Sequence, residues 1–226
     1  MTEQEKRFFE KIEEASMENP IVRIGAAGDF ITGLLKRAFT NEKGGTDANM
    51  WGYMAAVLTG VSVLVATKEV PDVIIADIIK DPRFMPMFKL ETKKGNFWMG
   101  DKLNRLLCDG PISAWDAVIL NYKNNGGDVT GLSPQKYVEN NAKNMGKNIK
   151  LWNNQHNPYE EISSAKNTYG SVRKLLEPYK LEPTEYHMAF ALALGKIIPV
   201  CEKVFPKELN CFDMAIETMM FVAHME

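Results

Sequence analysis

The densest group of residues suited to chemistry lies in segment 96–115, NFWMGDKLNRLLCDGPISAW. Trp98, Asp101, Asn104 and Arg105 follow one another closely there, and charged and amide groups beside a tryptophan are typical of a polar recognition site. The same residues also suit a structural role, because Asp101 could cap a helix and Trp98 could fill the core. Since caps and turns often border binding sites, all four are candidate binding residues.

Asp29 and His187 are two further candidate binding residues, because each places an ionisable group in an apolar stretch. Asp29 lies in GAAGDFITG, where its carboxylate would either face a cavity or mark the rim of an apolar helix face. His187 lies in YHMAFALALGKII, where it is either a ligand or base, or a buried structural histidine. If Asp29, Asp101, Arg105 and His187 share one cavity, they would line a small-molecule or enzyme site between helices.

Sequence templates for catalysis and metal binding are missing from the chain. H-E-x-x-H, C-x-x-C, G-x-S-x-G and the P-loop do not occur. Cys108, Cys201 and Cys211 are odd in number and lack paired spacing, which argues against a disulfide framework. Cys201 and Cys211 could lie near each other, but their separation of ten positions matches no metal-ligand spacing. We therefore predict no catalytic residue, no metal site and no cofactor.

The elements that must position these residues are helices. Asn19 and Pro20 suit the N-cap and first position of a helix that extends to about Phe39. Ser113 and Asn210 suit the caps of two later helices. Between such caps, apolar residues recur every three or four positions, and strands do not alternate with helices. The sequence therefore predicts an all-α fold, an irregular array of about nine or ten helices, with one short β-hairpin near 87–99.

The breaks in the helical pattern suggest how the chain is divided. Glycines 25, 28 and 33 follow no strand, so they indicate close helix–helix approach rather than a phosphate loop. The run NNGGD begins at position 124 and is the clearest helix breaker in the chain. We expect one helical domain over 1–226, with a candidate subdomain boundary at 124–131.

An uncharged stretch from Ala48 to Thr67, preceded by Thr46 as the expected cap, is long enough to cross a bilayer, which takes about 20 apolar residues. Its polar residues, among them Asn49 and Thr59, make it only moderately apolar, and a helix buried on all sides shows the same pattern. The N-terminus lacks the apolar segment of a signal peptide. We therefore expect a buried central helix, no membrane insertion and a cytoplasmic location.

Charge is distributed unevenly along the chain. Residues 121–180 carry nine lysines and arginines against five acidic residues. A basic helix over 133–152 with interleaved aromatics could bind nucleic acid through Lys136, Lys143, Lys147 and Lys150. A formal net charge of −2 and a pI of about 6.0 argue against nucleic acid as the partner, and a solvated lysine face explains the same pattern.

The function best matched by these patterns is protein binding. With 45% hydrophobic and 25% charged residues, the chain is neither disordered, collagen-like nor a disulfide scaffold. Because catalytic templates are missing, we expect a non-catalytic, soluble helical protein that binds a protein partner or itself, as an adaptor, an antitoxin or immunity-type protein, or an oligomeric module. Thirteen methionines support this weakly, since methionine surfaces adapt to partners. The alternatives are a small-molecule or enzyme site between helices and, third, nucleic-acid binding.

Overall fold

The computed structural model describes residues 17–70, 102–108, 113–141, 143–144, 158–206 and 209–225, and it is all-α there, as predicted. The helices are α2 (Pro20–Ala38), α3 (Ala48–Glu69), α5 (Lys102–Leu107), α6 (Ala114–Asn124), α8 (Pro158–Leu175), α9 (Tyr186–Val204) and α10 (Cys211–Ala223), with the short 3-10 helix η1 (Glu177–Tyr179). Residues 134–141 are also helical. The expected hairpin near 87–99 lies outside the described residues, so the hairpin and the count of nine or ten helices remain predictions.

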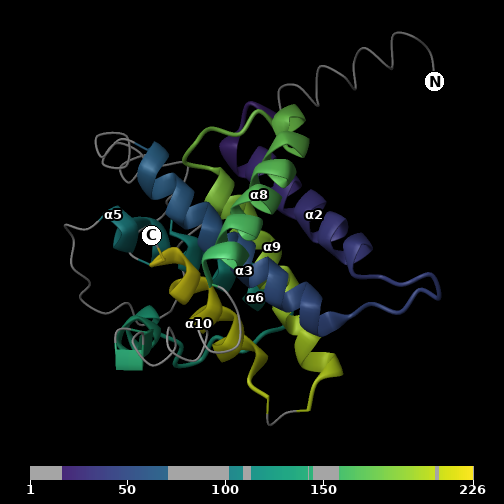
Figure 1. Cartoon of the computed structure of the whole chain (residues 1–226). Coiled ribbons are helices and arrows are strands. Elements are labelled where there is room, and N and C mark those ends of the chain that lie inside the picture. The colour runs from purple at the N-terminus through teal and green to yellow at the C-terminus, as the bar shows by residue number, and fades with distance from the viewer. Residues whose placement is uncertain are drawn as a thin grey trace.

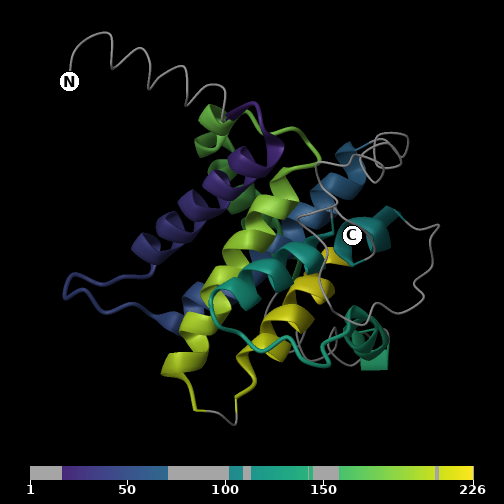
Figure 2. The same cartoon turned by 180° about the vertical axis from the view of Figure 1, so that it is seen from behind.

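Two antiparallel helices, α3 and α9, form the centre of the molecule (Figure 1). The Cys201 thiol near the end of α9 donates to the Ala48 carbonyl at the start of α3 (3.3 Å), and Thr59 Oγ1 lies 3.2 Å from the Phe190 carbonyl. Figure 1 shows α8 and α10 in front of α3, and Figure 2 shows α6 in front of α9 with α2 beside it. The core therefore lies between these layers of helices.

The uncharged stretch that begins at Ala48 is the buried helix α3, as expected. Residues on every side of it are buried, because α8, α9 and α10 all pack against it. By length and composition α3 could cross a membrane, with a mean hydropathy of 1.6, and 67% of its most apolar 18 residues are buried inside the protein. The cap was predicted one position too early: the Asp47 carboxylate, not Thr46, accepts from the Asn49 and Met50 amides.

The other three predicted caps are confirmed. The Asn19 side chain accepts from the Ile21 amide (3.0 Å), and Pro20 is the first residue of α2. Ser113 Oγ accepts from the Asp116 amide (3.2 Å) at the start of α6, and Asn210 accepts from the Asp213 amide (3.0 Å) at the start of α10. Each contact satisfies an amide that the first helical turn leaves without a partner.

Glycines set the spacing between the central helices. A Cβ atom at Gly60 of α3 would lie 2.6 Å from the Met219 carbonyl oxygen of α10, and one at Gly195 of α9 would lie 2.2 Å from the Val118 carbonyl oxygen of α6. Of the three glycines predicted to allow close approach on α2, only Gly28 does so, at 3.1 Å from the Ala189 carbonyl oxygen. Gly25 and Gly33 have no neighbour within 4 Å, because they lie on faces of α2 that α9 does not cover.

A buried ion pair joins the N-terminal ends of α2 and α9. The guanidinium of Arg23 donates to both carboxylate oxygens of Glu185, at 2.7 and 2.5 Å, and the Glu182 amide donates to the same carboxylate at 2.9 Å. The Glu185 side chain is only 4% exposed. Buried charges require such complete pairing, so this contact fixes how α2 lies along α9.

The breakers predicted a break in the helices, and residues 125–133 form a loop there, while a subdomain boundary at 124–131 stays a prediction. Gly126 and Gly131 both have positive φ, at 92° and 72°, which other residues rarely adopt. The Gly127 amide donates to the Tyr122 carbonyl (2.8 Å), and Val129 packs on the core. The loop connects α6 to the helical residues 134–141.

Candidate functional site

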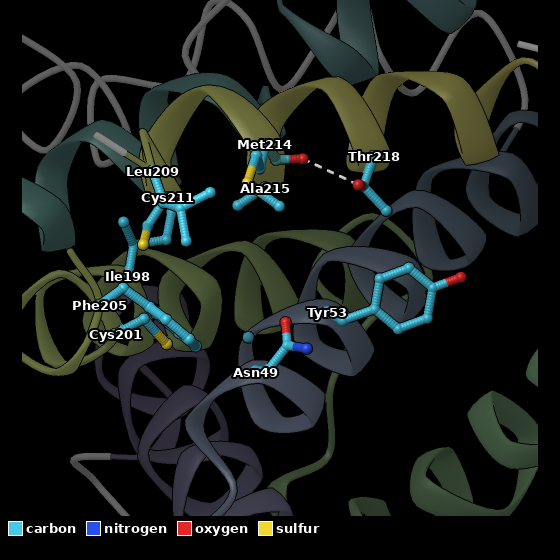
Figure 3. Close-up of a pocket in the computed structure, with 11 residues that line it drawn as sticks. Asn49, Tyr53, Ile198, Cys201, Phe205, Leu209, Cys211, Met214, Ala215 and Thr218 are labelled. Atoms are coloured by element: carbon cyan, nitrogen blue, oxygen red, sulfur yellow. Dashed lines mark hydrogen bonds between the residues drawn. The ribbon is translucent and has the colours of Figure 1, made fainter. Parts of the chain in front are cut away.

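A pocket of about 100 Å³ opens between the beginning of α3, the end of α9 and the beginning of α10 (Figure 3). From α3 and α9 it is lined by Asn49, Gly52, Tyr53, Ile198 and Cys201. The remaining lining residues follow α9 or belong to α10: Phe205, Leu209, Cys211, Met214, Ala215 and Thr218.

The pocket exists because α3 and α10 are close at one end and apart at the other. At the closed end, Gly60 lets α10 approach so tightly that even a methyl group would meet the Met219 carbonyl. Figure 3 shows α3 separating from α10 toward the pocket, where the end of α9 lies behind. Gly52 and Ala215 are small, so they leave space that a larger side chain would occupy.

Among the residues that the structure describes, the lining of the pocket carries no formal charge. Its polar groups are the Asn49 amide, the hydroxyls of Tyr53 and Thr218, and two thiols. The Thr218 hydroxyl already donates to the Met214 carbonyl (2.8 Å), as Figure 3 shows. An uncharged lining of this kind favours an apolar ligand group, since a charged one would lose its hydration without gaining an ionic partner.

Neither thiol in the pocket is activated for nucleophilic chemistry. Burial, reinforced by the neighbouring Cys211 thiol, raises the pKa of Cys201 to about 11. Burial also raises the pKa of Cys211, which is half-buried. Nucleophilic cysteines have a lowered pKa, so the pocket does not resemble a thiol-based active site.

The rim of the pocket is apolar and open to solvent. Met50 and Tyr53 of α3 are each 39% exposed, Leu209 is 48% exposed and Met214 of α10 is 54% exposed. Tyr53, Leu209 and Met214 line the pocket itself, and Met50 belongs to the same turn of α3. Exposed apolar side chains are ordinary when scattered singly, whereas a cluster around a hollow is typical of an interaction site.

Behind α10, on the side away from the pocket, two tyrosines are held by carboxylates. The Tyr122 hydroxyl donates to Glu202 (2.9 Å), and the Tyr137 hydroxyl donates to Asp213. Burial and these carboxylates raise the pKa of both tyrosines, which therefore stay protonated donors. Their rings pack with that of Phe212, so this network is structural.

Of the residues that the sequence marked as a site, those that the structure describes (Asp29, Arg105 and His187) do not line this pocket. Asp29 is 65% exposed on α2 and forms a surface ion pair with Lys196 of α9 (2.6 Å), so it lies on the rim of its helix face. His187 is fully buried at the start of α9, and Arg105 is half-buried on α5. Trp98, Asp101 and the Asn104 side chain lie outside the described residues, so a shared site for these groups stays a prediction.

Sequence analysis missed the pocket because α10 has two apolar faces. On its inward face, four residues at helical spacing are buried: Ile216, Met219, Met220 and Ala223. A second set, Cys211, Met214, Ala215 and Thr218, recurs at steps of three, one and three on the face that lines the pocket. The signal available in the sequence was Met214, an apolar residue that lies off the inward face of this helix.

The lysine face of 133–152 is described only in part. Lys136 is 57% exposed, lies 3.5 Å from Asp213 and stands over the Tyr137 ring. Lys143 is exposed, whereas Lys147 and Lys150 lie outside the described residues. Nucleic-acid binding through this face stays a prediction.

Metal-ligand clusters of the usual kind are also missing from the part of the chain that the structure describes: no group of three or more histidine, cysteine, aspartate or glutamate side chains is placed to hold an ion.

Among known proteins, no family model matches the sequence, no curated protein matches it and no solved structure matches it. Function is therefore inferred from the chain's own residues and geometry.

Proposed function

We propose that this protein acts by binding another protein through the pocket and its rim, and that the partner inserts one uncharged apolar side chain. The observation that carries this proposal is the coincidence of the pocket with the exposed rim residues Met50, Tyr53, Leu209 and Met214. Interfaces concentrate their binding free energy in such a centre, where one anchor fills a hollow and neighbours exclude water.

The size of the pocket favours a side chain over a metabolite. Ligand sites for small molecules usually measure about 300–1,000 Å³. At about 100 Å³ the pocket is far smaller, and it is also smaller than the engineered cavity of about 150 Å³ that binds benzene. One aliphatic side chain from a partner, such as leucine or methionine, matches this space best.

The charge pattern restricts the chemistry of that side chain. Because none of the lining residues is charged, an ionic anchor would be desolvated without compensation. The partner is therefore expected to present an aliphatic residue from a helix or loop. The hydroxyl of Tyr53 and the amide of Asn49 can orient the backbone around it.

A matched pair of variants tests the proposal. Met214→Glu places a charge on the rim, and Leu175→Glu places the same charge on α8 at a side chain that is equally exposed (51%) but does not line the pocket. Proteins that cross-link to the full chain in extract are identified by mass spectrometry, then purified and titrated by calorimetry. We expect Met214→Glu to weaken binding of the partner about 30-fold, or about 2 kcal/mol, and Leu175→Glu to leave it unchanged.

Two results would contradict docking at this pocket. One is equal loss of binding with both variants. The other is a purified partner whose cross-links avoid Tyr53 and Leu209 while its affinity is unaffected by Met214→Glu. If the captured protein is the chain itself, self-association replaces a separate partner, and sedimentation at increasing concentration measures it.

A further inference from the structure

Three sulfur atoms from two helices line the same pocket. Cys201 comes from α9, and Cys211 and Met214 come from α10 (Figure 3). The sequence places Cys201 and Cys211 ten positions apart, which matches no metal-binding motif. It is the packing of α10 against α9, and not the spacing in the sequence, that brings both cysteines to one hollow.

The positions of the two thiols are defined by their contacts. Cys201 is 4% exposed and directs its thiol toward α3, where it donates to the Ala48 carbonyl (3.3 Å). Cys211 is half-buried and is the first residue of α10. Both cysteines line the same pocket, so the two residues border one hollow.

This ligand set is selective by chemical softness. Thiolate and thioether sulfur atoms prefer soft ions, above all Cu(I), whereas Mg²⁺, Ca²⁺ and Mn²⁺ prefer oxygen. The lining contains neither a carboxylate nor an imidazole that would favour a harder ion. Zn²⁺ usually takes four ligands, which exceeds the sulfur atoms present.

We propose that Cys201, Cys211 and Met214 form a binding site for one Cu(I) ion. Both thiols bind as thiolates and Met214 adds its thioether sulfur. Two protons are released to solvent for each ion bound, and no electron is transferred. The site carries one net negative charge, which the positive end of the α10 dipole at Cys211 stabilises.

This inference is independent of the proposed docking function, because it concerns the isolated chain. The two uses share the pocket, so a bound ion would occupy the space assigned to the partner's side chain. Metal binding is therefore measured without any partner.

The test is a competition between the reduced full chain and bicinchoninate, a coloured Cu(I) chelator, without oxygen. We expect the chain to withdraw one equivalent of Cu(I). Cys211→Ala should weaken Cu(I) binding more than about 100-fold, and Met214→Leu about 10-fold. Met214 is 54% exposed and Cys211 half-buried, so both variants should stay folded, which circular dichroism checks.

The third cysteine supplies the matched control. Cys108 is fully buried but does not line the pocket, so Cys108→Ala should leave Cu(I) affinity unchanged within about twofold. Failure to withdraw Cu(I) from the chelator overturns the proposal. So does an equal loss of affinity in Cys108→Ala, which would mark the binding as adventitious thiol chemistry.

The pH dependence separates this site from binding by a single thiol. Release of two protons makes Cu(I) affinity rise about 100-fold per pH unit below the thiol pKa values, whereas one proton gives about 10-fold. A tenfold slope would overturn the two-thiolate site. X-ray absorption gives a further readout, because Met214→Leu should remove one of three sulfur neighbours, and an unchanged sulfur count would overturn the role of Met214.

Discussion

The two ends of the α3–α9–α10 core differ in how completely they are closed. At one end, Gly60 brings α10 against α3, and the Arg23–Glu185 pair joins α2 to the start of α9. At the other end, within the described part of the chain, Gly52 faces the Cys201 side chain and no backbone atom, and the helices leave a pocket open to solvent. The same helices are thus tightly packed at one end and leave an open pocket at the other. Binding sites are expected where packing is incomplete.

The largest expected effect is at the closed end. Glu185→Ala leaves the Arg23 guanidinium and the Glu182 amide without their shared acceptor, in a site where the Glu185 side chain is 4% exposed. We expect the free energy of unfolding to fall by about 3 kcal/mol, because the largely buried guanidinium then loses its carboxylate partner. Urea denaturation followed by circular dichroism measures this change.

The surface ion pair on the same two helices is the control for that measurement. Asp29 and Lys196 also join α2 to α9, but their side chains are 65% and 39% exposed. Asp29→Ala should therefore change the free energy of unfolding by less than about 1 kcal/mol. A comparable loss in both variants would mean that burial does not distinguish the two pairs.

Gly60→Ala should have the next largest effect. Its Cβ would lie 2.6 Å from the Met219 carbonyl oxygen and 2.7 Å from Val222 Cβ, so helix backbones must move apart. We expect a loss of about 2 kcal/mol in the free energy of unfolding, after the better helix propensity of alanine is included. In Gly33→Ala, where no neighbour lies within 4 Å, propensity alone should stabilise the protein by up to about 1 kcal/mol.

Gly52→Ala, on the same helix but at the open end, should have the smallest effect. Its Cβ would lie 3.0 Å from the Cys201 sulfur, a side-chain atom that can move toward the pocket. Loss of space and gain of helix propensity should nearly cancel, leaving a change within about 1 kcal/mol by the same denaturation measurement. If Gly52→Ala costs as much as Gly60→Ala, the open end is as tightly packed as the closed one.

Much of the secondary structure could be predicted, and the proposed binding surface could not. Apolar residues at helical spacing, such as Ile24, Ile31, Val118 and Ile216, lie in the core, since a helix face follows from spacing along the chain. Periodicity does not say whether a second apolar face is covered, and this missed the Met214 face of α10. Asp29 was a candidate binding residue for the same reason. An acidic residue in an apolar stretch can face a cavity or lie at the rim of the apolar helix face, and Asp29 lies at the rim.

What the sequence determines by itself is local. Asn19, Ser113 and Asn210 cap their helices through contacts within three residues, and the long apolar stretch after Asp47 requires a buried helix. Tertiary structure alone decided that Gly28, and not Gly25 or Gly33, meets α9, and that Arg23 pairs with Glu185. It also brought Cys201 and Cys211 to one pocket. Such pairings depend on the crossing angle and register of packed helices, which are set by many distant contacts together and are not encoded in any one stretch of chain.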